Sequence, residues 1–160
     1  MAYPAAVRHR WILAWTSVAA VLVLGYFTAS VITHPGSRIR AALASADRVV
    51  IVEHLRDETL EPRVVTLAKS RFTELGDALD TPWDSGLSIW HCLCHGDAHL
   101  EFRAGERLLL VVGIQHLKAI RLADGLGDAS LTAAAAVKLR ALFTENGFAC
   151  ATRKPGDPIP

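Results

Sequence analysis

The sequence contains little cysteine and methionine, with three and one residues of 160, and it has no acidic residue before Asp47. So few cysteines exclude a small fold held together by several disulfides. The chain also lacks a P-loop, a dinucleotide-binding glycine pattern, G-x-S-x-G and H-E-x-x-H. Without any of these enzyme templates, we expect a non-enzymatic protein that uses no cofactor.

No charged residue occurs in 11–32, although 51% of the whole chain is hydrophobic and the mean hydropathy is +0.28. About 20 apolar residues are enough for a helix to cross a hydrocarbon core of ~30 Å. This stretch therefore predicts a single transmembrane helix in a lipid bilayer. Its expected anchor residues are interfacial aromatics and a small-residue pair, namely Trp11, Trp15, Tyr26, Gly25 and Ala29.

The numbers of basic residues on the two sides of this stretch are nearly equal, so they hardly decide its orientation in the membrane. Arg8 and Arg10 precede it, and three arginines follow it within 33–48. A cleaved signal peptide is the alternative, but such peptides have an apolar core of about 7–15 residues. We favour an uncleaved signal anchor. The short N-terminal tail then stays inside, and the larger C-terminal domain lies on the extracytoplasmic, periplasmic side.

Beyond residue 37 the chain contains 16 acidic and 15 basic residues, and this balance of charge argues against nucleic acid as a partner.

The length of the chain suits one domain with an appendage. We expect an N-terminal tail at 1–10, the membrane helix at 11–32, a linker with a short helix at 33–47, an α+β domain at 48–150 and a flexible tail at 151–160.

Hydrophobic periodicity predicts an α+β domain with a small, mostly antiparallel sheet and two helices packed on one face. After a break at Pro35 and Gly36, Ser37 is expected to cap the linker helix, and Thr132 the last helix. The expected helices are 38–46, 71–79 and 133–145, and the expected strands are 48–55, 63–68, 87–94, 98–103, 108–114 and 117–122.

Cysteine and histidine gather in the run WHCLCHGDAH, residues 90–99. Thiolate and imidazole are ligands for zinc or copper, so one interpretation is a metal site. Its candidate ligands are Cys92, Cys94, His99 and His116. The spacing differs from the C-x₂₋₄-C pairs of structural zinc sites and from the C-x-x-C-H of haem attachment.

Two other interpretations of this run stay open. In an oxidising compartment, Cys150 can pair with Cys92 or Cys94, whereas Cys92 and Cys94 would be strained partners for one another. Alternatively, the cysteines are ordinary small apolar side chains and the histidines belong to a polar strand face.

The pattern Cys92-x-Cys94-x-Gly96-Asp97, followed by a hairpin, a strand ending in Gln115-His116 and a final helix, resembles a group of uncharacterised small bacterial proteins over residues 90–147. The resemblance implies an α+β fold and carries no activity. Members of the group often have two adjacent histidines where this chain has Gln115 and His116.

The sequence thus predicts a membrane-anchored interaction domain, an accessory subunit of a larger membrane protein complex. A metal- or thiol-dependent protein using the Cys92, Cys94 and histidine cluster is one alternative. A tethered immunity or inhibitor protein is another.

Overall fold

The computed structural model describes residues 17–18, 21–23, 25, 34–55, 61–82, 96–123 and 128–152. The chain divides into two compact units, Met1–Thr33 and His34–Pro160. The described residues of the first unit are helical. Within the described ranges, no helix combines the length and the apolar character needed to cross a membrane. Most of the predicted span lies outside these ranges, including Trp11, Trp15, Tyr26 and Ala29.

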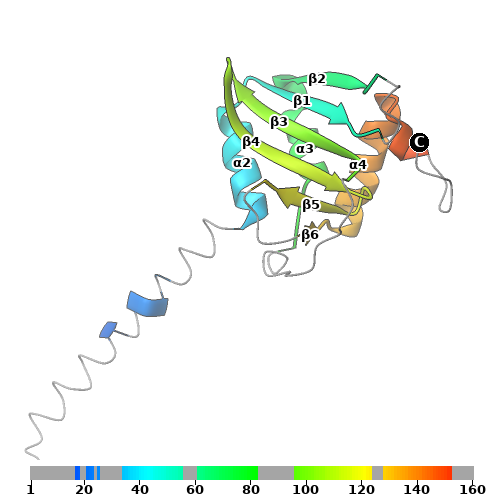
Figure 1. The fold of residues 1–160 in the computed structure, drawn as a ribbon. Helices are drawn as coiled ribbons and strands as arrows, with labels where there is room; N and C mark the ends of the chain where they lie inside the picture. Colours follow the sequence, from blue (N-terminus) through cyan, green and yellow to red (C-terminus); the bar gives the residue numbers. More distant parts are fainter. Residues whose placement is uncertain are drawn as a thin grey trace, which may run out of the picture. The chain divides into compact units, whose positions relative to one another are not determined.

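The second unit is an α+β domain, as the sequence predicts. In the part that the structure describes, six strands form one sheet in the order β2-β1-β3-β4-β5-β6, and every neighbouring pair is antiparallel (Figure 1). The strands are β1 (Arg48–Glu53), β2 (Val64–Ala68), β3 (Ala98–Ala104), β4 (Arg107–Gln115), β5 (Ala119–Leu122) and β6 (Asp128–Ser130). The helices are α2 (Pro35–Ser45), η1 (Lys69–Arg71), α3 (Phe72–Ala78), α4 (Ala133–Glu145) and α5 (Ala149–Thr152).

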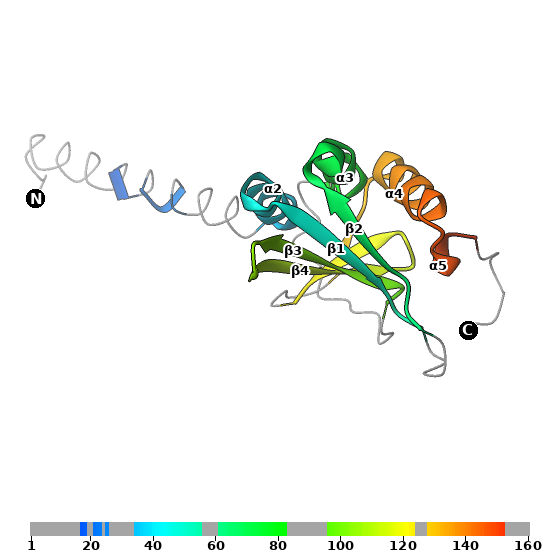
Figure 2. The same cartoon turned by 90° about the horizontal axis from the view of Figure 1, so that it is seen from above.

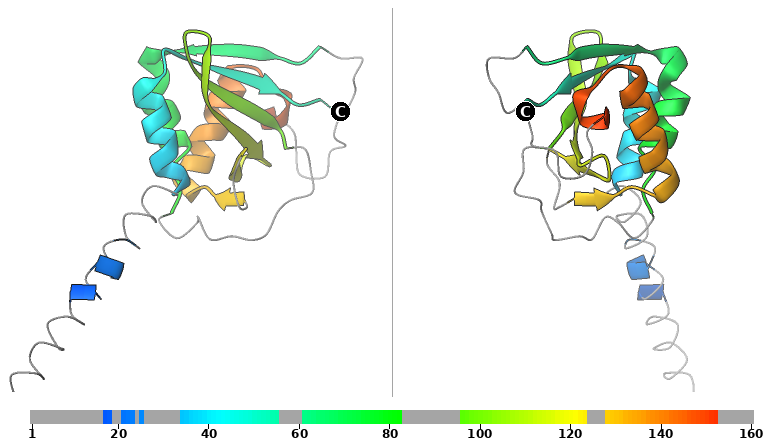
Figure 3. Two further views of the ribbon diagram at one scale, coloured as in Figure 1. Left: turned by 60° about the vertical axis from the view of Figure 1, so that its left-hand side comes forward. Right: turned by 90° about the vertical axis from the view of Figure 1, so that its right-hand side faces the viewer.

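Helices α2, α3 and α4 lie side by side over one face of the sheet (Figures 2 and 3). The core lies between these two layers. Its largest fully buried side chains include Phe102 of β3, Phe143 of α4 and Phe148. Two helices were expected on this face, and α2 is the third because its buried Ile39 and Leu43 join the same core.

The start of α2 corrects one sequence-based expectation. The helix begins at Pro35 rather than after Ser37, and its cap is the extended residue His34, while the end of the segment 11–32 lies outside the described residues. The His34 Nδ1 atom accepts a hydrogen bond from the Gly36 N–H at 3.1 Å, and its Nε2 lies 2.9 Å from the Pro82 carbonyl oxygen. Proline suits the first helical position, because its missing N–H would have no partner there in any case.

The last helix matches its prediction at both ends. Thr132 caps α4 by accepting a hydrogen bond from the Ala135 N–H at 3.1 Å. Gly147 ends the helix with a φ of +73°, a conformation that glycine adopts without strain. The short β6 and α5 were not expected from the sequence, and the predicted strand at 87–94 lies outside the described residues.

Candidate functional site

Polar side chains gather on the face of the sheet opposite the helices. Along β3, Leu100 and Phe102 are fully buried in the core, so the alternate residues His99, Glu101 and Arg103 lie on the other face. These three side chains are about a quarter exposed. The predicted alternation of β3 is therefore confirmed. We refer to this side of the sheet as the outer face.

Two histidines contact one another on the outer face. The β1–β3 register places Val52 opposite His99, so His54, just beyond β1, is the diagonal neighbour of His99. The Nε2 atom of His54 lies 2.7 Å from the Nδ1 atom of His99, and the ring centroids are 5.0 Å apart. At this distance one of the two facing ring nitrogens donates a hydrogen bond to the other.

Glu101 fixes the other side of the His99 ring. Its Oε1 atom lies 3.5 Å from the His99 Nε2, and its Oε2 accepts hydrogen bonds from Arg103 at 2.7 and 2.8 Å. The hydrogen bond from Arg103, more than any other contact, holds the pKa of Glu101 below its usual range, against a smaller upward effect of burial. An ionised Glu101 favours the proton on Nε2 of His99, which leaves the Nδ1 lone pair directed towards His54.

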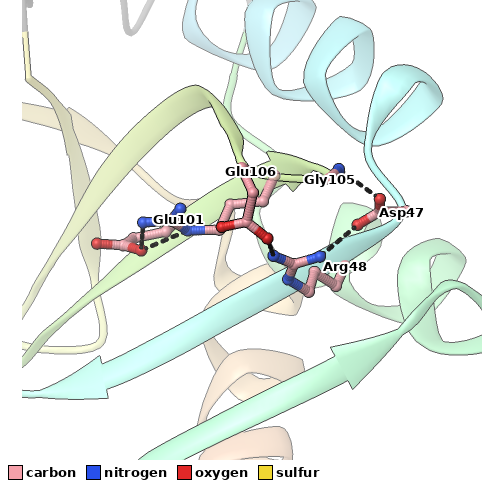
Figure 4. A network of polar contacts seen from close by, with 6 residues as sticks. Asp47, Arg48, Glu101, Gly105 and Glu106 are labelled. Carbon is pink, nitrogen blue, oxygen red and sulfur yellow. Dashed lines mark hydrogen bonds and ion pairs between the residues drawn. The ribbon is translucent and has the colours of Figure 1, made fainter.

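A second polar network continues the outer face towards the β3–β4 turn (Figure 4). The Asp47 carboxylate accepts a hydrogen bond from the Gly105 N–H at 2.6 Å and pairs with Arg48 at 3.4 Å. Arg48 also pairs with Glu106 at 3.5 Å. These contacts fix the turn to the start of β1, and the exposed ion pairs contribute little stability by themselves.

The Gly96-Asp97 pair of the sequence motif immediately precedes β3 and contacts the residues at the ends of β1 and β4. The Asp97 N–H donates to the Ile114 carbonyl at 2.7 Å, and the Asp97 carbonyl accepts from the His54 N–H at 2.9 Å. Gly96 has a φ of +80°, and a Cβ there would lie 2.8 Å from the Gln115 Nε2. The motif thus has a structural role in placing His54 and His99 on adjacent strands.

The predicted metal ligands are found in different places. His99 lies beside His54, whereas His116 is exposed in the β4–β5 turn, where His116 and Leu117 have φ values of +54° and +53°. The Lys118 N–H closes this turn on the Gln115 carbonyl at 3.0 Å. Cys92 and Cys94 lie outside the described residues. Among the residues that are described, no three His, Cys, Asp or Glu side chains form a group able to hold a metal ion.

Sequence reasoning missed His54 and Glu53. Glu53 is only 6% exposed, and its Oε1 accepts from the N–H groups of Ala149 and Cys150 at 2.7 and 3.3 Å. This carboxylate therefore joins the end of β1 to α5, the helix that carries the half-buried Cys150. The signal available in the sequence was the pair of polar residues, Glu53 and His54, directly after the apolar run VVIV of this strand.

A shallow hollow of about 370 Å³ lies on the opposite side of the domain, between α2, α3 and α4. Its charged lining residues are Arg40, Asp80 and the ion pair between Asp77 and Lys138, whose charged atoms lie 2.6 Å apart. Its described lining contains no histidine or cysteine. Comparison with protein-family models, with curated proteins and with solved structures found no match to this chain.

Proposed function

We propose that the domain binds a transition metal ion, zinc or copper, between the imidazoles of His54 and His99. The observation that carries this proposal is the 2.7 Å separation of the His54 Nε2 and the His99 Nδ1. Imidazole nitrogen is a common ligand of both metals, and the two ring nitrogens already lie next to one another.

The surroundings of His99 support this proposal. A histidine that binds a metal through one nitrogen usually donates its other N–H to a carboxylate, which orients the ring. Glu101 occupies that position beside the His99 Nε2, and Arg103 keeps Glu101 ionised. Glu101 would then be a positioning residue, because it contacts the metal-binding His99 and not the metal itself.

The spacing of the two nitrogens requires a small adjustment. Two nitrogens bound to zinc at ~2.0–2.1 Å in a tetrahedral site lie about 3.3 Å apart. The two nitrogens of His54 and His99, now 2.7 Å apart, would therefore separate by roughly 0.6 Å. His54 would move its Nε2 proton to Nδ1, so that both facing nitrogens offer a lone pair.

Cys92, Cys94 and His116 remain proposed additional ligands. Cys94 precedes Gly96 by two residues, and two residues span at most about 7 Å. Gly96 in turn lies against Gln115, the residue before His116. Thiolate ligands would increase the preference of the site for zinc or copper(I) over harder cations.

We propose that the domain is tethered to a bilayer by the helix at 11–32, as an uncleaved single-pass anchor with the domain outside the cytoplasm. The exposure of Val18, Val21, Leu22 and Val23, between 50% and 69%, supports a helix surface that faces lipid. The expected roles as an accessory subunit of a membrane complex or as an immunity protein stay predictions. Both are compatible with a bound metal.

The test is a metal titration of the full chain in detergent, followed by the ¹⁵N chemical shifts of the imidazoles. We expect one equivalent of zinc to shift the His54 Nε2 and the His99 Nδ1, while the nitrogens of His34, which caps α2, stay unchanged. His54→Ala should abolish the shift of His99. Equal small shifts of all histidines would show nonspecific binding and would contradict the proposal.

A further inference from the structure

The strand β2 lies at one edge of the sheet, and its backbone there is considered independently of the metal site. The Glu53 N–H donates to the Arg63 carbonyl at 3.0 Å, and this bond sets which residues of β2 face β1. Val65 and Leu67 direct their backbone groups towards β1, so the N–H and C=O groups of Val64, Thr66 and Ala68 are directed outward. Within the described ranges, β1 is the one strand that pairs with β2, so these outward groups face no further strand, although the Ala68 carbonyl accepts the first hydrogen bond of η1.

The side chains of β2 do not protect this edge. Its sequence, VVTLA, contains neither a charged residue nor proline, and three of its residues are β-branched. Val64 is 57% exposed, and Thr66 and Ala68 are exposed as well. Soluble sheets usually protect an edge strand with lysine, proline or a bulge, because an open edge pairs readily with another strand. Figure 1 shows β2 as the outermost strand, next to β1.

The charges at the two ends of β2 distinguish between candidate occupants. Arg63 and Lys69 flank the strand, and both are exposed. In the antiparallel register that overlaps two copies of β2 fully, Arg63 of one copy would lie opposite Lys69 of the other. Like charges directly opposite one another destabilise a strand pair. A second copy of this chain is therefore a poor occupant.

We propose that β2 binds an extended segment of a partner protein that carries a carboxylate at each end of a short β-branched run. The segment would add to the sheet as a seventh strand, with backbone hydrogen bonds to Val64, Thr66 and Ala68. Its carboxylates would pair with Arg63 and Lys69. The guanidinium of Arg63 is already held in place, because its Nε donates to the Asn146 carbonyl oxygen.

The test uses the full chain in detergent and two synthetic peptides with the run Val-Thr-Val-Thr-Val, one ending in glutamate and one in lysine at both ends. We expect the acidic peptide to bind and to slow hydrogen exchange at the amides of Val64, Thr66 and Ala68. The lysine peptide should bind more weakly by about tenfold, because each of its ends meets a like charge.

Two variants of one residue separate edge pairing from other binding. Thr66→Pro removes an outward N–H, and proline is tolerated on an edge strand whose N–H faces solvent, so the domain should fold and lose the peptide. The matched control Thr66→Val keeps the N–H and should retain binding. Equal binding of both peptides would overturn the proposal, as would unchanged binding by Thr66→Pro. Protection of these amides that grows with protein concentration alone would also overturn it, because the occupant would then be a second copy.

Discussion

Gly96 packs directly against the backbone of Ile114, and a Cβ at Gly96 would lie 2.6 Å from the Ile114 carbonyl oxygen. Its φ of +80° also disfavours any other residue. We expect Gly96→Ala to lower the free energy of unfolding by roughly 2–3 kcal/mol, measured by urea denaturation. Gly105→Ala is the matched control, because φ is +57° there but a Cβ would meet nothing within 4 Å. The control should cost only about 1 kcal/mol. Equal losses in the two variants would show that the close approach to Ile114 is unimportant.

The buried Glu53 carboxylate should determine the stability of the C-terminal helix. Glu53→Ala leaves the N–H groups of Ala149 and Cys150 without their acceptor, at a cost of about 1–3 kcal/mol. Hydrogen exchange of these two amides should become faster in this variant. Glu145→Ala is the control, because it removes only a surface ion pair with Arg71 and should cost less than about 1 kcal/mol. Unchanged exchange at Ala149 in Glu53→Ala would refute this assignment.

Arg103 should set the pKa of Glu101. Because the folded-state pKa of Glu101 is lowered, its contribution to stability is present above the unfolded-state pKa and is lost as the pH falls through the folded-state pKa. Arg103→Gln should raise the pKa of Glu101 and should destabilise the fold more at neutral pH than in strong acid. The ¹³C shift of the Glu101 carboxyl measures the pKa directly.

Arg48→Gln is the matched control for this titration, because Arg48 lies on the same face but pairs with Asp47 and Glu106. We expect it to leave the pKa of Glu101 unchanged. A pKa that moves equally in the two variants would indicate a general effect of lost positive charge instead of the Arg103 hydrogen bonds.

Glu101 should also affect metal affinity without binding the metal itself. Glu101→Gln weakens the acceptor for the His99 Nε2–H, and losing such an orienting partner typically lowers metal affinity about 10–100-fold. Competition titration with a chromophoric chelator measures the change. Glu106→Gln, at a side chain that is 97% exposed on the same face, should leave the affinity unchanged. Equal affinities in the two variants would exclude a positioning role for Glu101.

Local signals in the sequence predicted much of the fold. The α4 helix was predicted with both of its ends because the Thr132 cap, the helical periodicity and the Gly147 stop all lie within or next to the helix. The alternation of buried and partly exposed side chains along β3 could also be predicted from local sequence. By contrast, the cap of α2 depends on a contact between His34 and Pro82, 48 residues apart, which no local pattern reports. The four-residue α5 is too short for a period to be recognised.

The candidate site could be predicted only in part for the same reason. His99 stood out because it lies in the cysteine- and histidine-rich run. His54 is 45 residues away, and it meets His99 only because β1 pairs with β3 as well as with β2. That register is a property of the whole sheet. The sequence therefore singled out one of the two paired histidines, but not the partner that lies next to it.

Metal content tests the central claim most directly. The full chain is purified in detergent without chelators, and zinc and copper are measured by elemental analysis beside the His54→Ala, His99→Ala double variant. The account predicts about one metal ion per chain in the native protein and close to none in the double variant, with both proteins folded by circular dichroism. Native protein without stoichiometric metal that also binds none on titration would contradict the account, as would a double variant with undiminished metal.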